Sequence, residues 1–77
     1  MKLYYLWQDE NNDYDTYDSC VVCAESEEEA KKIHPDGDGN FKRCTWASCP
    51  ENVKCELIGI ATDNVEKGVV IASFNAG

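Results

Sequence analysis

The stretch that decides the fold is Ser19–Pro35, SCVVCAESEEEAKKIHP, in which a strand pattern gives way to a helix pattern. The β-branched pair in SCVVCA favours a strand over Ser19–Ala24. A helix begins at Ser26, because this serine and Glu29 have the spacing of a capping box, which satisfies free backbone N–H groups of the first turn. Pro35 disfavours helical geometry at the residue before it, so the helix ends there after about two turns.

Three further apolar runs predict strands on either side of this stretch: 3–7 (LYYLW), 53–61 (VKCELIGIA) and 68–74 (GVVIASF). Residues 11–18 are rich in Asn and Asp and predict a loop, as do residues 36–40. Residues 41–51 are irregular, with Trp46 as their anchor. The order β-β-α-β-β, built from sequential hairpins, predicts an α+β fold with a small antiparallel sheet packed on one short helix. We expect one domain over residues 1–77.

Charge is distributed unevenly along the chain. The formal net charge is -8, and between Leu3 and Ala30 there are nine acidic residues and no Lys or Arg. Direct nucleic-acid binding depends on a basic face that neutralises phosphates, so we exclude it. The acidic stretch instead predicts a solvated surface or one that engages a basic protein.

Hydropathy and cysteine content bear on location and assembly. No run approaches the roughly 18 apolar residues of a membrane span, and no cleavage site follows the first apolar run. We therefore expect a cytoplasmic protein with no membrane partner, in which the five cysteines are reduced thiols. A chain this short buries only about 60% of the surface that its unfolded form exposes, so its core is marginal. Because small domains often gain stability by association, we expect a homo-oligomer.

Two cysteine patterns bear on metal binding. Cys20 and Cys23 form a CxxC, but within a strand residues three apart point to opposite faces, so their sulfurs diverge. Cys44, Cys49 and Cys55 do not have the spacing of a known zinc finger, although together with His34 they leave a metal site as an open alternative. Apart from this alternative, we predict no metal and no cofactor.

The run DGDGN resembles the start of a calcium loop, with Asp36, Asp38 and Asn40 at alternate positions. Phe41 stands where the loop requires Gly, and Ala47 stands where it requires a bidentate Glu. The run is therefore predicted to be a turn.

Catalytic groups are few. His34 is the single histidine of the chain, and no sequence feature places a nucleophile or an orienting group beside it. No phosphate loop, GxSxG or HExxH motif is present. We predict a binding protein rather than an enzyme, with its ligand near the end of the helix and the Trp46 loop. The candidate ligand-binding residues are the aromatic and basic side chains Tyr14, Tyr17, Lys32, His34, Lys42, Arg43 and Trp46; Tyr14 and Tyr17 are expected to be exposed.

Three segments resemble a family of short bacteriophage and prophage proteins: NNDYDTYDSCVVCAESEEEAKKIHP, ENVKCELIGIA and GVVIASFNAG. The motifs YDTYDS and ASFNAG carry the resemblance, which covers most of the chain. The family has no settled activity, so it brings no catalytic residues. The resemblance implies a role against a bacterial host defence, in the host cytoplasm.

Two mechanisms fit this role. The first is sequestration of a nucleotide-derived immune signal, in a pocket often built between subunits. The second is inhibition of a host or defence protein through the acidic surface. A third hypothesis is a metal-stabilised structural accessory protein.

Overall fold

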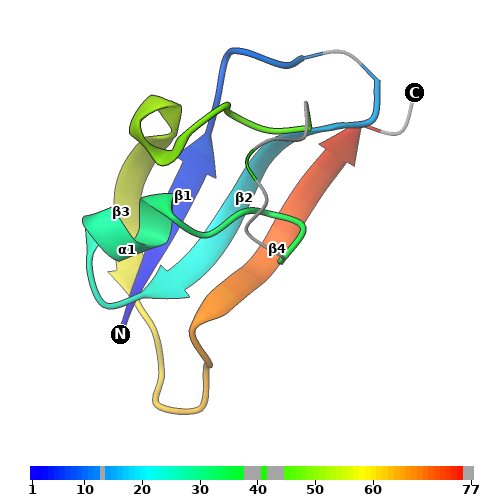
Figure 1. The fold of residues 1–77 in the computed structure, drawn as a ribbon. Helices are drawn as coiled ribbons and strands as arrows, with labels where there is room; N and C mark the ends of the chain where they lie inside the picture. Colours follow the sequence, from blue (N-terminus) through cyan, green and yellow to red (C-terminus); the bar gives the residue numbers. More distant parts are fainter. Residues whose placement is uncertain (13, 38–40, 42–44, 76–77) are drawn as a thin grey trace.

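The computed structural model describes residues 1–12, 14–37, 41 and 45–75. In chain order its elements are β1 (Lys2–Trp7), β2 (Thr16–Ala24), α1 (Glu27–Lys31), the 3-10 helix η1 (Pro50–Asn52), β3 (Lys54–Ile60) and β4 (Gly68–Asn75). In the described part of the chain, four strands form one antiparallel sheet, and α1 lies against one of its faces (Figure 1). The predicted α+β class, a small antiparallel sheet on one short helix, is confirmed.

The strand order differs from two sequential hairpins. The order is β3-β1-β2-β4, so consecutive β3 and β4 lie at opposite edges of the sheet. Both β2 and β3 run antiparallel to β1 and thus parallel to each other, and parallel strands need a long crossover. The described residues between β2 and β3, which include α1 and η1, provide this crossover on one face, and residues 61–67 then connect the two edges (Figure 1). Hydrophobic periodicity predicts where strands lie along the chain but not which strands become neighbours.

The strand β2 begins earlier than its sequence suggests. Residues 16–18 belong to the Asp-rich segment that predicts a loop, yet Thr16 and Tyr17 pair with Asn75 and Phe74 of β4. The turn ends at Asp15, whose φ of 61° is in the left-handed region that Asp tolerates better than most residues. Pairing with β4 therefore overrides the local loop preference.

The helix α1 is held at its start by the predicted cap, but it is shorter than the two turns predicted. It ends at Lys31, because the next N–H groups, those of Lys32 and Ile33, bond to the carbonyl oxygens three residues before them. The Ser26 hydroxyl accepts a hydrogen bond from the Glu29 N–H at 3.3 Å. The Glu29 carboxylate accepts one from the N–H of Glu25, also at 3.3 Å, rather than from that of Ser26. Because the helix has only five residues, packing of its buried Ala30 on the sheet contributes more than helix propensity.

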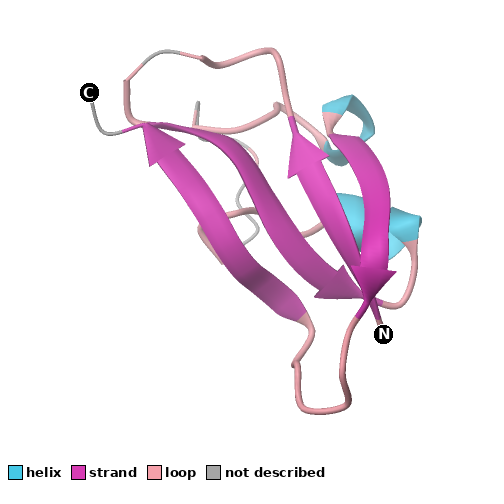
Figure 2. Cartoon of the chain, turned by 180° about the vertical axis from the view of Figure 1, so that it is seen from behind, coloured by secondary structure: helices cyan, strands magenta, loops and turns pink. Residues whose placement is uncertain are grey.

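The core lies between the sheet and the crossover. Its buried members are Tyr4, Leu6, Cys20, Val22, Ala24, Ala30, Trp46, Ala47 and Val53. Cys20 belongs to this core, whereas Cys23 projects from the opposite face, where its Sγ lies 3.9 Å from the carbonyl oxygen of Val65. The divergence of the two CxxC sulfurs is confirmed. No described helix covers the opposite face of the sheet (Figure 2).

The turn after β1 is organised by the side chain of Gln8, which is buried. Its amide NH₂ donates to the carbonyl oxygens of Asn11 (2.7 Å) and Tyr17 (3.1 Å), and its Oε1 accepts from the N–H groups of Glu10 and Asn11. Asn11 in turn donates to the carbonyl oxygen of Trp46 at 2.6 Å. Gln8 thereby connects the β1–β2 turn to the crossover.

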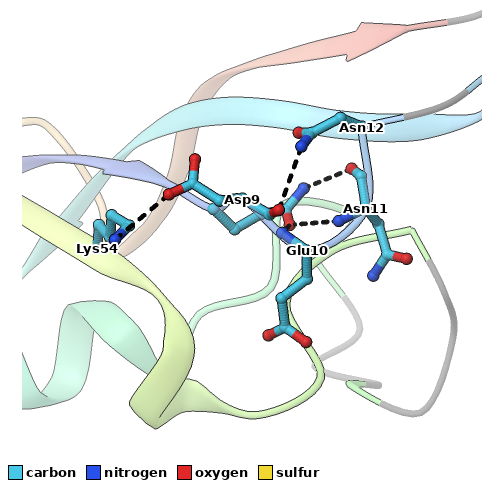
Figure 3. Close-up of polar contacts among 6 residues, drawn as sticks. Asp9, Glu10, Asn11, Asn12 and Lys54 are labelled. Carbon is cyan, nitrogen blue, oxygen red and sulfur yellow. Dashed lines mark hydrogen bonds and ion pairs between the residues drawn. The ribbon is translucent and has the colours of Figure 1, made fainter.

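Charged contacts fasten the same turn to the β3 side of the sheet. Asp9 lies 3.3 Å from the ammonium group of Lys54 at the start of β3 (Figure 3). The Glu10 carboxylate accepts hydrogen bonds from the N–H and the hydroxyl of Ser48, just before η1. The hydrogen bonds from Ser48 hold the pKa of Glu10 below its ordinary value.

Candidate functional site

A cleft of about 340 Å³ lies between the end of α1 and the start of β4. Its lining residues are Lys32, Ile33, His34, Gly37, Lys67, Gly68 and Val69. The chain reaches this place because residues 33–37 pass across β2 toward β4 after α1 ends (Figure 1). The cleft is near the lower end of the size range for small-molecule sites.

Two lysines from different elements stand at the cleft. Lys32 caps the end of α1, and Lys67 directly precedes β4. Each has a glutamate neighbour on α1. Lys32 Nζ lies 3.8 Å from Glu28 Oε1, and Lys67 Nζ lies 3.5 Å from Glu29 Oε1. Exposed ion pairs of this kind contribute only about 0–1 kcal/mol, so an anionic ligand can compete for both ammonium groups.

The wall of the cleft includes His34, which is 1% exposed. Its Nδ1 lies 2.8 Å from the Asp36 carboxylate, a contact that holds the ring in place. A turn closed by the Gly37 N–H and the His34 carbonyl oxygen follows, with Gly37 at a φ of 88° that favours glycine. This turn brings the chain back over the sheet.

Aromatic rings surround His34. Its ring centroid lies 6.2 Å from that of Tyr17, 5.2 Å from that of Phe41 and 6.5 Å from that of Trp46, all in edge-on arrangements. Tyr17 also packs on Phe74 of β4 at 4.8 Å. We call Tyr17, His34, Phe41, Trp46 and Phe74 the aromatic cluster. It forms the interior behind the cleft.

Three buried polar atoms at the aromatic cluster have no hydrogen-bond partner among the described residues. They are His34 Nε2, Thr45 Oγ1 and Trp46 Nε1. Buried polar groups are normally paired, and an unmade hydrogen bond costs about 1–3 kcal/mol. Among the described residues, buried side-chain atoms without a partner therefore gather at this cluster.

The described side chains offer little for covalent chemistry. Burial raises the pKa of the Cys20 thiol to about 12, and burial together with Glu27 raises that of Cys55 to about 11. Thiols in this state are protonated at neutral pH and are weak nucleophiles. Within the described ranges, no three His, Cys, Asp or Glu side chains are placed to hold a metal ion. Cys44, Asp38 and Asn40 of the two sequence-based metal hypotheses lie outside those ranges.

The residues expected from the sequence to bind a ligand are only partly brought together. Lys32 and His34 line the cleft, and Tyr17 and Trp46 lie behind His34. Tyr14 is 74% exposed as expected, but it precedes the start of β2, which pairs with the far end of β4.

Two points differ from the sequence analysis or lie beyond the structure. Tyr17 was expected to be exposed and is half-buried instead, because pairing of β2 with β4 turns its ring onto Phe74. Lys42 and Arg43 lie outside the described residues. Sequence reasoning missed Lys67 and Val69, since no local signal places the start of β4 beside the end of α1.

A second surface lies on the uncovered face of the sheet. Tyr5 and Trp7 stack there with ring centroids 5.4 Å apart. A groove of about 360 Å³ runs beside them; it is lined by Tyr5, Ser19, Cys20, Val21, Ile71, Ala72 and Ser73. Ile71 is 65% exposed. This surface is apolar, whereas the cleft carries the lysines.

No protein-family model, no curated protein and no solved structure matches this chain. Within the described residues, none of the helices has the length and apolar character required to cross a membrane.

Proposed function

We propose that this chain is a non-enzymatic binding protein that holds a small anionic ligand in the cleft beside α1. The observation that carries the proposal is the placement of Lys32 and Lys67, from separate elements, over an apolar wall of Ile33 and Val69. The chain has only seven basic residues and a net charge of -8, so two lysines at one cleft are a considerable local concentration of positive charge.

The ligand class follows from the size and charge of the cleft. Two ammonium groups suit one or two phosphates, while the acidic remainder of the chain repels a long polyanion such as nucleic acid. The apolar wall of Ile33 and Val69 suits a base and sugar. A nucleotide-derived signal fits these features, and the resemblance to phage proteins supports sequestration of an immune signal in the host bacterial cytoplasm.

Titration calorimetry against a panel of cyclic dinucleotides, cyclic ADP-ribose derivatives and mononucleotides tests this function. We expect one class to bind, with an affinity that falls as salt concentration rises. Charge reversal of Lys32 and Lys67 together should weaken binding by at least about tenfold. The matched control is Lys54→Glu at the other edge of the sheet, which should leave the affinity unchanged. Absence of heat with every member of the panel contradicts the proposal.

The second candidate is inhibition of a host or defence protein. The stacked pair Tyr5–Trp7 and the exposed Ile71 favour it, because aromatic and aliphatic groups on a flat face commonly anchor protein interfaces. The acidic residues Glu27, Glu28 and Glu29 would add attraction to a basic target. Affinity capture from host cells with wild-type protein, with Tyr5→Ala and with the charge-reversed glutamates tests it. If one defined protein is captured equally well by the wild type and by all these variants, the result contradicts both the apolar-face version and the acidic-surface version of this hypothesis.

A further inference from the structure

The strand β4 is an edge strand without protective charges. Within the described sheet it pairs with β2 on one side only, and its residues Gly68–Asn75, GVVIASFN, include no ionisable side chain. Val70, Ile71 and Phe74 are 50%, 65% and 46% exposed. The opposite edge, β3, carries Lys54 and Glu56. Charged residues are a common protection of edge strands against further pairing, so the β4 edge is the one open to another strand.

We propose that β4 pairs antiparallel with β4 of a second copy of this chain, and that the paired copy completes the cleft. The pairing joins two four-stranded sheets into one. It specifies the interface of the expected homo-oligomer. The completion of the cleft rests on the proposed ligand-binding function, whereas the strand pairing does not.

Charge opposes a second copy least at this edge. Each copy carries a net charge of -8, so most surfaces of two copies repel one another, and the uncharged β4 edge is where that repulsion is smallest. A two-fold antiparallel pair also places the start of one strand beside the end of the other. Lys67, which directly precedes β4, then approaches the partner's Asp15. Within each copy, the N–H of Asp15 donates a hydrogen bond to the carbonyl oxygen of Asn75 at the end of β4.

The bulge in β4 sets which residues can form the new ladder. Val70 is the extra residue, because Ile71 and Val69 face the adjacent residues Val21 and Val22 of β2. The regular run that begins at Ile71 therefore supplies the continuous pairing. Gly68 and Val69 then lie past the end of the partner's strand, beside the turn that precedes the partner's β2.

This geometry gives Tyr14 a place in the site. In its own copy, Tyr14 precedes Thr16, which pairs with Asn75 at the end of β4. The cleft lies at the start of β4, where Gly68 pairs with Cys23, so Tyr14 is distant from the cleft of its own copy. In the paired assembly the turn of the partner's Tyr14 arrives at the start of β4, which lines the cleft. Lysines from one copy and an exposed tyrosine from the other then share one inter-subunit site.

Sedimentation equilibrium of the ligand-free protein tests the pairing. We expect a species of twice the 8.6 kDa chain mass at micromolar concentrations. Ile71→Lys should raise the dimer dissociation constant by at least about tenfold, because it places a charge in the uncharged ladder. The matched control, Ile60→Lys, changes an exposed isoleucine of the β3 edge and should shift the constant less than about twofold. Far-ultraviolet circular dichroism verifies that both variants fold.

A monomer at all concentrations overturns the pairing, as does a dimer that Ile60→Lys dissociates and Ile71→Lys does not. The shared site has its own test, the affinity for whichever panel nucleotide binds the wild type. Tyr14→Ala should weaken that binding while the dimer persists, and monomeric Ile71→Lys should weaken it too. Binding at wild-type affinity by the Ile71→Lys monomer overturns the shared site. A dimer that binds no panel member contradicts only the proposed function.

Discussion

The two sides of the sheet are stabilised in different ways. At the β3 side, polar contacts fasten the edge: Asp9 pairs with Lys54, Glu10 binds Ser48, and α1 packs nearby. At the β4 side, the crossover rests on the sheet through the aromatic cluster, in which three polar atoms lack partners among the described residues. The β3 side is therefore held mainly by polar contacts at its edge, whereas the β4 side is held mainly by buried aromatic packing.

The largest expected effect tests whether the β4 side depends on the aromatic cluster. Trp46→Ala should lower the free energy of unfolding by about 3–5 kcal/mol, because Trp46 is fully buried and its removal leaves a cavity. For a domain this small, that loss is a large share of the total stability. Trp7→Ala is the matched variant, since Trp7 is only half-buried on the uncovered face, and it should cost less than about 2 kcal/mol. Urea denaturation of both variants measures the difference, and equal losses would remove the distinction between the two sides.

The sequence predicts the local structure of this chain better than its long-range arrangement. The side-chain cap at Ser26 and the divergence of Cys20 and Cys23 follow from residue spacing alone, and both are present. The separation of β3 and β4 to opposite edges could not be predicted, because it depends on which strands pair with β1 and β2. The position of Lys67 at the cleft could not be predicted for the same reason.

A smaller effect is expected from the side chain that couples the two sides. Gln8→Ala removes four hydrogen bonds and leaves the backbone groups of Glu10, Asn11 and Tyr17 without their partner. We expect a loss of about 2–3 kcal/mol in the free energy of unfolding. Asn12→Ala, which removes one exposed hydrogen bond of the same turn, should cost less than about 0.5 kcal/mol. Chemical denaturation compares them; a neutral Gln8→Ala would show that the turn is held by other contacts.

The smallest effect concerns the carboxylate that fastens the β3 side. Hydrogen bonds from Ser48 lower the pKa of Glu10 in the folded protein below its ordinary 4.5. A carboxyl group with a lowered folded pKa contributes stability above its unfolded pKa, and this contribution is lost as pH falls through the folded value. We therefore expect the stability difference between wild type and Glu10→Gln to be constant above about pH 6 and to shrink as pH falls below about 4.5.

The shape of this pH dependence separates a specific bond from general acidity. Every carboxylate of a chain with a net charge of -8 contributes to a broad change in stability at low pH, so wild type alone cannot isolate Glu10. Glu56→Gln removes an equal charge from β3 without touching Ser48, and it provides the reference curve. Denaturation profiles between about pH 3 and pH 7 should be offset by a constant amount above about pH 6 and should converge for the two variants below about pH 4.5, where Glu10 titrates. Parallel profiles would mean that the β3 side owes its order to packing against α1, because the hydrogen bonds to Ser48 would then contribute nothing measurable.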